Sequence, residues 1–227
     1  MAPRYPVPAH ATIIEPFAGA AGYSLRYPDR DVILVEKYPV IAGIWRYLIA
    51  VKESEIRAIP LVDAVDDLPA WVPEEARNLI GFQMNCAHPT PCKTLSAGLK
   101  RNRANGRTII GWGERRRELV ANQVEHIRHW KIIEGDYGNA PDAHATWFID
   151  PPYNNRAGQY YKHCALDYTV LGDWCETRRG QVMVCENVGA AWLPFQPFIK
   201  PKSTMGRTSA VEAIFYMHKT HYSGMAA

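Results

Sequence analysis

Four consecutive residues, Asp150, Pro151, Pro152 and Tyr153, have the types and the spacing to form a ligand site. They follow Trp147–Ile149, an apolar run that is typical of a buried parallel strand, and two prolines cannot continue its hydrogen-bond ladder. In an open α/β sheet, ligands bind at the carboxyl ends of the strands, so the acid and the tyrosine would lie over a pocket. Taken alone, the tetrapeptide is equally compatible with a strand that ends in a Pro-rich turn.

A loop of small residues follows the first expected strand, Ala11–Ile14. The loop contains Glu15, Pro16, Phe17, Ala18, Gly19 and Ala20. Small residues let the backbone lie close to a ligand at a helix N-terminus. The next expected strand, Val32–Glu36, ends in an acid seventeen positions after Gly19. This is near the ~20-residue spacing at which an acid meets ribose hydroxyls in dinucleotide-binding folds. Loop and acid together predict a nucleoside-binding site.

Positive charge is concentrated between residues 93 and 117. The basic residues of this segment are Lys93, Lys100, Arg101, Arg103, Arg107, Arg115, Arg116 and Arg117, against Glu114 as the single acid. A solvated face explains many charge runs, but a block of one sign that also contains asparagines, glycine and Trp112 is suited to follow a phosphate backbone. This basic segment therefore favours a nucleic-acid contact, although the net charge of the whole chain, +3, does not.

Length and composition indicate a globular protein, with 47% hydrophobic and 22% charged residues. The 227 residues suit one domain with an insertion, or two small domains. No apolar run is long enough to span a bilayer and Met1–Ala11 has no signal-peptide pattern, so we expect no membrane association. Five cysteines, an odd number, suit a reducing cytoplasm better than a disulfide framework. Cys86, His88 and Cys92 are potential zinc ligands, but no second pair completes a site, so we expect no metal.

Apolar runs and helical periodicity alternate along the chain. Strands are expected at Ala11–Ile14, Val32–Glu36, Lys131–Tyr137, Trp147–Ile149, Gln181–Cys185 and Val211–Met217, and helices from Pro39, over Glu114–Trp130 and over Tyr168–Cys175. Met1–His10 is Pro-rich and reads as an irregular lead-in, and prolines divide Lys52–Pro91 into short helical pieces and loops. The alternation predicts an α/β fold with a mostly parallel, doubly wound sheet.

These stretches, in this order, resemble the class I S-adenosylmethionine-dependent DNA methyltransferases, specifically the DNA adenine methylase family of phages and prophages. Glu15–Gly19 matches its cofactor loop, Glu36 its ribose acid and Asp150–Tyr153 its catalytic motif, while Asp136 and Tyr137 resemble an acid-aromatic pair that precedes its catalytic strand. The resemblance extends from Ile13 to Met217. Two features depart from the family: Ala21 stands at its second glycine, and its Gly/Lys-containing N-terminal segment has no match in Met1–His10.

The resemblance implies a Rossmann-like class I methyltransferase fold with an antiparallel terminal strand. The chain 1–227 would be a single methyltransferase domain, with an inserted helical and basic target-recognition region at about 53–129. It also implies S-adenosylmethionine as cofactor, DNA as partner and a cytoplasmic location, and leaves the oligomeric state open between monomer and homodimer. Asp150 and the Pro151 carbonyl would accept the hydrogens of an adenine N6 amine, and Tyr153 would stack on the flipped base. Methyl transfer would be direct, without a metal.

Other activities remain open at this point. Cytosine-C5 methyltransferases also have a Phe-Ala-Gly loop, a Pro-Cys nucleophile and a Glu-Asn-Val motif, which Pro91-Cys92 and Glu186-Asn187-Val188 match. The order of the motifs argues against that family, because its Pro-Cys follows the strand that Asp150 follows here and no strand leads into Cys92. A cytosine-N4 methyltransferase, an RNA methyltransferase and a catalytically lapsed nucleic-acid-binding relative are the further alternatives.

Overall fold

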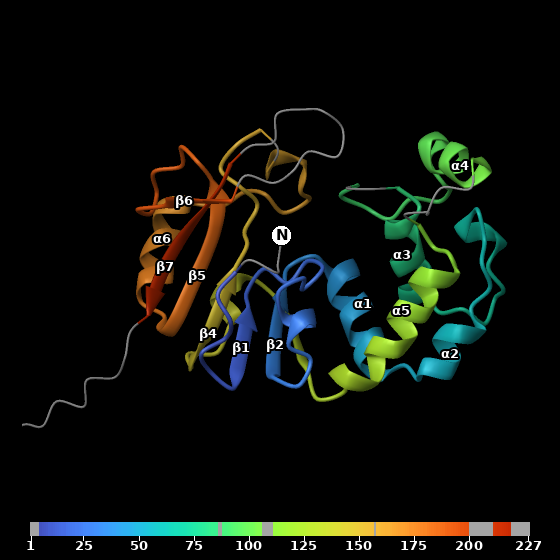
Figure 1. Ribbon diagram of the computed structural model, residues 1–227, viewed down its shortest axis with the longest axis horizontal. Helices are drawn as coiled ribbons and strands as arrows, with labels where there is room; N and C mark the ends of the chain where they lie inside the picture. The colour runs from blue at the N-terminus through green and yellow to red at the C-terminus, as the bar shows by residue number, and fades with distance from the viewer. Residues whose placement is uncertain (1–4, 86–87, 106–110, 157, 200–210, 219–227) are drawn as a thin grey trace, which may run out of the picture. The chain divides into compact units, whose positions relative to one another are not determined.

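The computed structural model describes residues 5–85, 88–105, 111–156, 158–199 and 211–218 (Figure 1). The chain divides into two compact units. The first unit consists of Met1–Lys37 and Lys131–Ala227, and the second consists of Tyr38–Trp130. The second unit begins ahead of the region expected from about residue 53, because it includes the helix that starts at Pro39.

The first unit contains one seven-stranded sheet (Figure 1). Its strands are β1 (Thr12–Glu15), β2 (Asp31–Glu36), β3 (Lys131–Glu134), β4 (His144–Ile149), β5 (Arg179–Asn187), β6 (Gln196–Ile199) and β7 (Glu212–His218). They lie in the order β3-β2-β1-β4-β5-β7-β6. Strands β1 to β5 pair in parallel, whereas β7 is antiparallel to both β5 and β6. The sheet confirms the predicted α/β fold, and its order is consistent with the class I methyltransferase fold.

Helix α6 (Tyr168–Glu176) covers one face of this sheet through an apolar cluster. Leu171 and Cys175 of the helix lie in one buried cluster with Trp147, Val182 and other strand residues. These strands are apolar at almost every position because a parallel sheet is covered on both faces. The side chain of Asp167 begins the helix by accepting hydrogen bonds from the N–H groups of residues 169 and 170, as an N-cap does.

The N-terminal segment packs on the opposite face, which the sequence did not predict. Tyr5 is only 6% exposed, and its ring meets Phe148 edge-on at 4.9 Å. The side chain of Gln181 accepts a hydrogen bond from the Ala9 N–H at 2.9 Å and donates one to the Val7 carbonyl at 3.1 Å. Residues 5–10, the described part of this segment, have no helix or strand of their own, yet they are bonded to the centre of the sheet.

Strand β6 was also absent from the sequence prediction. Gln196–Ile199 is short and contains Pro197, and a proline usually argues against a strand. The strand lies at the edge of the sheet, beside β7 alone, and its pairing with β7 is irregular between Pro197 and Ile199. An edge position is where a proline is tolerated, because its missing N–H faces no neighbouring strand.

The second unit is helical. Its helices are α1 (Pro39–Ala50), α2 (Glu53–Ala58), α3 (Glu74–Gln83), α4 (Ala97–Ala104) and α5 (Glu114–Val124), with short 3-10 turns at Val65–Asp67 and Glu125–Ile127. Trp112 is fully buried, and its indole N–H donates to the Pro60 carbonyl at 3.3 Å. No helix of the described residues in either unit has the length and apolar character needed to cross a membrane.

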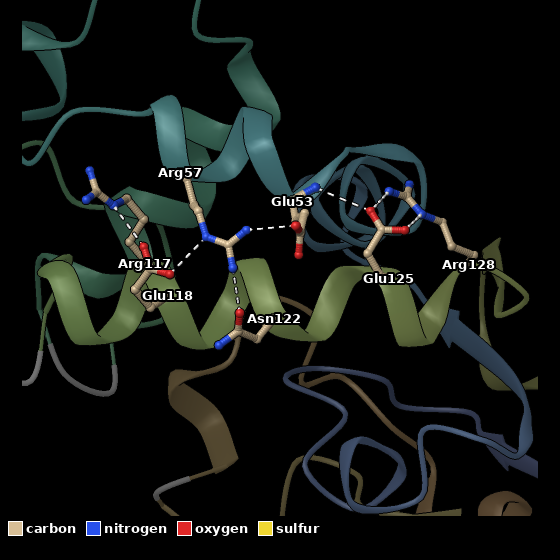
Figure 2. A network of polar contacts seen from close by, with 7 residues as sticks. All are labelled: Glu53, Arg57, Arg117, Glu118, Asn122, Glu125 and Arg128. Carbon is tan, nitrogen blue, oxygen red and sulfur yellow. Dashed lines mark hydrogen bonds and ion pairs between the residues drawn. The ribbon is translucent and has the colours of Figure 1, made fainter.

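Polar contacts join α2 to α5 in this unit (Figure 2). Arg57 donates to Glu118 at 2.9 Å and to Asn122 at 2.7 Å, and it pairs with Glu53 within its own helix. The Glu53 N–H in turn donates to Glu125 at 3.4 Å. Arg57 therefore makes two of the hydrogen bonds that link α2 to α5.

Candidate active site

Asp150 lies at the carboxyl end of β4, at the point where the strand order reverses. Strand β4 pairs with β1 on one side and with β5 on the other, so the chain crosses over between β1 and β4. In doubly wound sheets this switch point is where ligands bind. Pro151 and Pro152 end the strand directly after Asp150, and the Pro152 carbonyl accepts a hydrogen bond from the Tyr168 hydroxyl at 2.7 Å.

The carboxyl of Asp150 is accessible to solvent but closely surrounded by protein. The residue is exposed, while its neighbour Pro151 is buried. The surrounding protein, and after it the charge of Glu212, raises the pKa of Asp150 to about 7, and the Tyr153 hydroxyl acts in the opposite direction. An accessible acid with this pKa can accept a hydrogen bond or a proton near neutral pH.

Tyr153 is half-buried at the same edge, and its hydroxyl is already bonded. It donates to Oε1 of Glu212, on β7, at 3.2 Å. Burial, followed by the charge of Asp150, raises the pKa of Tyr153, so the hydroxyl remains a donor. The next residue, Asn154, donates its backbone N–H to Glu186 at 2.9 Å. The catalytic motif expected from the sequence is thus held by acids from β5 and β7.

Glu15 ends β1 and is 2% exposed. Its Oε1 accepts the Ser24 N–H at 2.8 Å, and burial raises the pKa of Glu15 to about 8. Glu15 precedes the small-residue loop and Ser24 follows it, so this hydrogen bond joins the two ends of the loop. Pro16 and Ala18 are buried with it, while Gly19 and Ala20 are exposed at the surface.

Gly19 has the backbone conformation that a close ligand approach requires. Its φ is +45°, and a Cβ at this position would meet no atom within 4 Å, so the space in front of the loop is open. The Gly19 N–H donates to Oε2 of Glu36 at 2.9 Å, which places the expected ribose acid against the loop. Ala21, which replaces the family's second glycine, also has a φ of 45°. The loop thus adopts a left-handed conformation at both positions despite the substitution.

Asp136 and Tyr137 follow β3 and lie beside this loop. The Tyr137 ring stacks on Phe17 with centroids 5.5 Å apart and an interplanar angle of 27°. Asp136 pairs with Lys37, the residue after Glu36, at 2.7 Å. The structure therefore brings together every predicted cofactor residue at the ends of β1, β2, β3 and β4, which are adjacent strands.

The sequence did not identify Tyr5 and Glu212 as site residues. Glu212 is 5% exposed and accepts a hydrogen bond from the Tyr5 hydroxyl at 2.6 Å. Glu212 begins a strand recognised only by its alternation, and an acid at the start of an apolar strand was the one available signal. Tyr5 lies in a Pro-rich stretch with no periodicity, so no nearby sequence pattern indicated that it is part of the site.

Glu186, which matches part of a cytosine-C5 motif, is an acceptor for neighbouring N–H groups in the structure. Its two carboxylate oxygens accept three N–H groups: those of Asn154 at 2.9 Å and Asn187 at 2.8 Å, and the indole N–H of Trp192 at 3.1 Å. The residue is 1% exposed. Glu186 thus ties the loop after Tyr153 to the end of β5.

The basic segment belongs to the second unit, and its side chains differ in accessibility. Lys93, Lys100, Arg101 and Arg115 are exposed, Arg116 is half-buried, Arg103 lies on α4, and Arg107 lies outside the described residues. Arg117 instead donates to the Ile59 carbonyl at 3.1 Å, and its side chain, which lies against Glu118 in Figure 2, is 20% exposed. Arg117 therefore serves the packing of this unit.

Cys92 is also in the second unit, in the connection between α3 and α4. Its thiol donates to the Thr90 carbonyl at 3.8 Å, and no strand of the described residues leads into it. Within the described residues, no three histidine, cysteine or acidic side chains are grouped so that they could hold a metal ion. The comparison with protein families finds no match for the chain, and the search of curated proteins finds no relative.

Proposed function

We propose that this protein transfers a methyl group from S-adenosylmethionine to the exocyclic N6 amine of adenine in DNA. The observation that carries the proposal is the position of Asp150, an accessible acid at the switch point of the sheet, beside an open glycine loop that is bonded to Glu36. A nucleoside-binding loop next to an acid that can receive an amine is the arrangement that such a transfer needs.

The residues around the loop fit the cofactor. The open space at Gly19 leaves room for close approach, Glu36 lies where ribose hydroxyls would bind, and Phe17 with Tyr137 offers an aromatic surface. When bound, S-adenosylmethionine supplies an electrophilic methyl group. Glu15 would act indirectly by closing the loop through Ser24.

Asp150 would orient and activate the amine. An exocyclic amine is a poor nucleophile because its lone pair is delocalised into the ring, and hydrogen bonds from its N–H groups to Asp150 and the Pro151 carbonyl favour the reactive geometry. As the nitrogen gains a methyl group it must release one proton, and Asp150, with its raised pKa of about 7, is suited to take it. Tyr153 would stack on the base after it leaves the duplex, which costs a few kcal/mol of unstacking.

The proposed partner is DNA, and the proposed location is the cytoplasm. Exposed basic side chains in the second unit support a polyanion as partner, namely Lys93, Lys100, Arg101 and Arg115. The cytoplasmic location rests on the odd number of cysteines.

Cytosine-C5 transfer would require a thiolate that adds to the ring, and Cys92 is its candidate. Two observations weigh against that alternative. Among the described residues no strand precedes Cys92 in the α3–α4 connection, and both oxygens of Glu186 are occupied by backbone and indole N–H groups. We therefore expect Cys92→Ala to retain substantial activity.

The test is incubation with isotopically labelled cofactor and mixed DNA and RNA, followed by mass spectrometry of the nucleosides. We expect label in N6-methyladenine from DNA, with the wild-type chain and with Cys92→Ala. Label on cytosine carbon that disappears in Cys92→Ala would overturn the proposal. Label on cytosine N4 would keep the mechanism and change the base, and label in RNA would change the polymer. A chain that binds nucleic acid without transferring label or binding the cofactor in calorimetry would be a lapsed relative.

A further inference from the structure

Glu212 reaches the proposed acceptor site from a strand far along the chain. It is the first residue of β7 and pairs in register with Asn187, the last residue of β5. Because β7 runs antiparallel to β5, its beginning lies at the carboxyl edge of the parallel strands, the edge that carries Asp150. Glu212 is therefore placed at the site by topology.

Two tyrosine hydroxyls converge on one oxygen of this carboxyl group. Tyr5 donates to Oε1 at 2.6 Å and Tyr153 donates to the same atom at 3.2 Å. The other oxygen, Oε2, is fully buried and has no hydrogen-bond partner among the described residues. Tyr5 is itself fixed, because its ring stacks on Phe198 at 5.1 Å and its hydroxyl accepts from the Cys185 thiol at 3.4 Å.

A buried carboxylate with no basic partner disfavours folding. In the described part of the chain Glu212 forms no ion pair, and the titratable groups near it at this edge are acids, tyrosines and the Cys185 thiol. The two hydroxyl donors offset part of that cost, and an apolar side chain would avoid it entirely. The carboxyl group thus contributes to the arrangement of its neighbours more than to the core.

We propose that Glu212 is a positioning residue of the acceptor site, which holds Tyr153 by its hydroxyl and places a second negative charge beside Asp150. The inference rests on the proposed function. A ring held at its hydroxyl end cannot swing away, so the face offered to a flipped base is present before the base arrives. Because the Tyr153 side chain is already ordered, less conformational entropy is lost when the base binds.

The charge environment of Asp150 makes the proposal testable without activity. The titratable groups that act with it are Glu15 on β1, Tyr153 and Tyr161 after β4, Cys185 and Glu186 on β5, and Glu212 on β7. After the effect of the surrounding protein, Glu212 is the largest influence that raises the pKa of Asp150, while the Tyr153 hydroxyl lowers it. Removal of the two groups should therefore move that pKa in opposite directions.

The experiment titrates the carboxyl of Asp150 by carbon NMR in the wild-type chain and three variants. We expect Glu212→Gln to lower the pKa of Asp150 below about 7 and Tyr153→Phe to raise it. Asp142→Asn is the matched control: it removes one negative charge ahead of β4, where Asp142 pairs with Arg179, and should leave the titration unchanged. An Asp150 titration that Glu212→Gln does not move would overturn the inference.

Methyl-transfer kinetics test the positioning role separately. Glu212→Met, which has no oxygen to accept from the Tyr153 hydroxyl, and Tyr153→Phe should each reduce kcat/KM for DNA about tenfold, and the double variant should be no worse than either, because both remove the same hydrogen bond. Multiplied effects in the double variant would contradict the inference. Wild-type protein that transfers no methyl group would contradict the proposed function. The titration of Asp150 would still test the effect of Glu212 on its pKa, because that measurement does not depend on activity.

Glu212→Asp covers the case in which Glu212→Gln does not fold, as judged by circular dichroism. It retains the charge but shortens the reach to Tyr153. We expect the pKa of Asp150 to stay in place while kcat/KM falls about tenfold, the loss of one hydrogen bond. Wild-type kinetics in Glu212→Asp would overturn the positioning role.

Discussion

The carboxyl edge of the sheet and the α2–α5 contact both contain several charged residues, but they differ in how far these residues are buried and in whether they form ion pairs. At the sheet edge Glu15, Glu186 and Glu212 are all at most 5% exposed, and none forms an ion pair in the described part of the chain. In the α2–α5 contact and the turn after it, in contrast, Arg57 pairs with Glu53 and Glu118, and Arg128 with Glu125, with all of these side chains at least 31% exposed (Figure 2).

The difference indicates where each unit can bind a ligand. Exposed ion pairs contribute about 0–1 kcal/mol each, so the α2–α5 network is a modest structural contact. Buried carboxylates need hydrogen-bond donors, and Oε2 of Glu212 has none among the described residues. The sheet edge is therefore where we expect a ligand to bind.

The largest expected effect is on catalysis at the sheet edge. Asp150→Ala should reduce methyl transfer about 10²–10³-fold, as loss of a preorganised polar group does, while cofactor binding in calorimetry stays near wild type. Asp142→Ala, which removes an exposed acid, is the control. Turnover close to wild type in Asp150→Ala would remove the basis for the assignment of the motif.

The next largest effect is on stability, at Glu186. Glu186→Ala leaves three N–H donors without their acceptor, so we expect a loss of roughly 2–4 kcal/mol in the free energy of unfolding, measured with urea. An exposed acid such as Asp142 should lose less than about 0.5 kcal/mol when changed in the same way. A small loss in Glu186→Ala would show that water replaces the carboxylate at this edge.

A smaller effect is expected at the cofactor loop. Gly19→Ala places a side chain on a left-handed backbone, which lowers the free energy of unfolding by about 1–2 kcal/mol. Alanine also reduces the conformational entropy of the unfolded chain, which offsets about 0.4–1 kcal/mol of that loss. The net loss should be about 1 kcal/mol, accompanied by weaker binding of S-adenosylmethionine in calorimetry. Gly22→Ala, where φ is not positive and the space is equally open, should instead raise stability by about 0.4–1 kcal/mol. Equal losses in both variants would contradict the role given to the backbone of Gly19.

The smallest effect separates two neighbouring arginines of α5. Arg115 is exposed, so Arg115→Ala should reduce the slope of log K against log salt on duplex DNA by about 0.9 and leave stability unchanged. Arg117 donates to the Ile59 carbonyl, so Arg117→Ala should cost about 1 kcal/mol of stability and leave the slope in place. The reverse pattern would make Arg117 the phosphate contact.

Local signals were sufficient to predict the α/β fold and every strand of the sheet except β6, and the predicted site residues stay a prediction. Apolar runs end in Glu15, Glu36 and Asp150, and because parallel strands end at one edge, their acids lie together there. Ala21 was noticed as a departure from the family pattern, but its left-handed backbone is visible only in the structure.

The remaining parts of the site depend on contacts between distant residues. The bond from Tyr5 to Glu212 joins positions 207 apart, and neither residue has a distinctive neighbourhood. Arg117 and Arg115 look identical within a run of three arginines, and only the packing of α5 on α2 distinguishes them. Hydrophobic periodicity and motif spacing predict single helices and strands, so they do not predict contacts between residues that are distant in the sequence.

The bond from Tyr5 to Glu212 also has a consequence for synthesis of the protein. A ribosome that adds about 5–20 residues per second needs about 10–40 s to pass from one residue to the other, a separation of 207 positions. Throughout that interval the Tyr5 hydroxyl lacks its carboxylate, although the glycine loop and the catalytic motif have already been made. A chain arrested before β7 would therefore carry the glycine loop without the carboxyl group that accepts from Tyr5 and Tyr153, so these two hydrogen bonds form only after β7 has been synthesised.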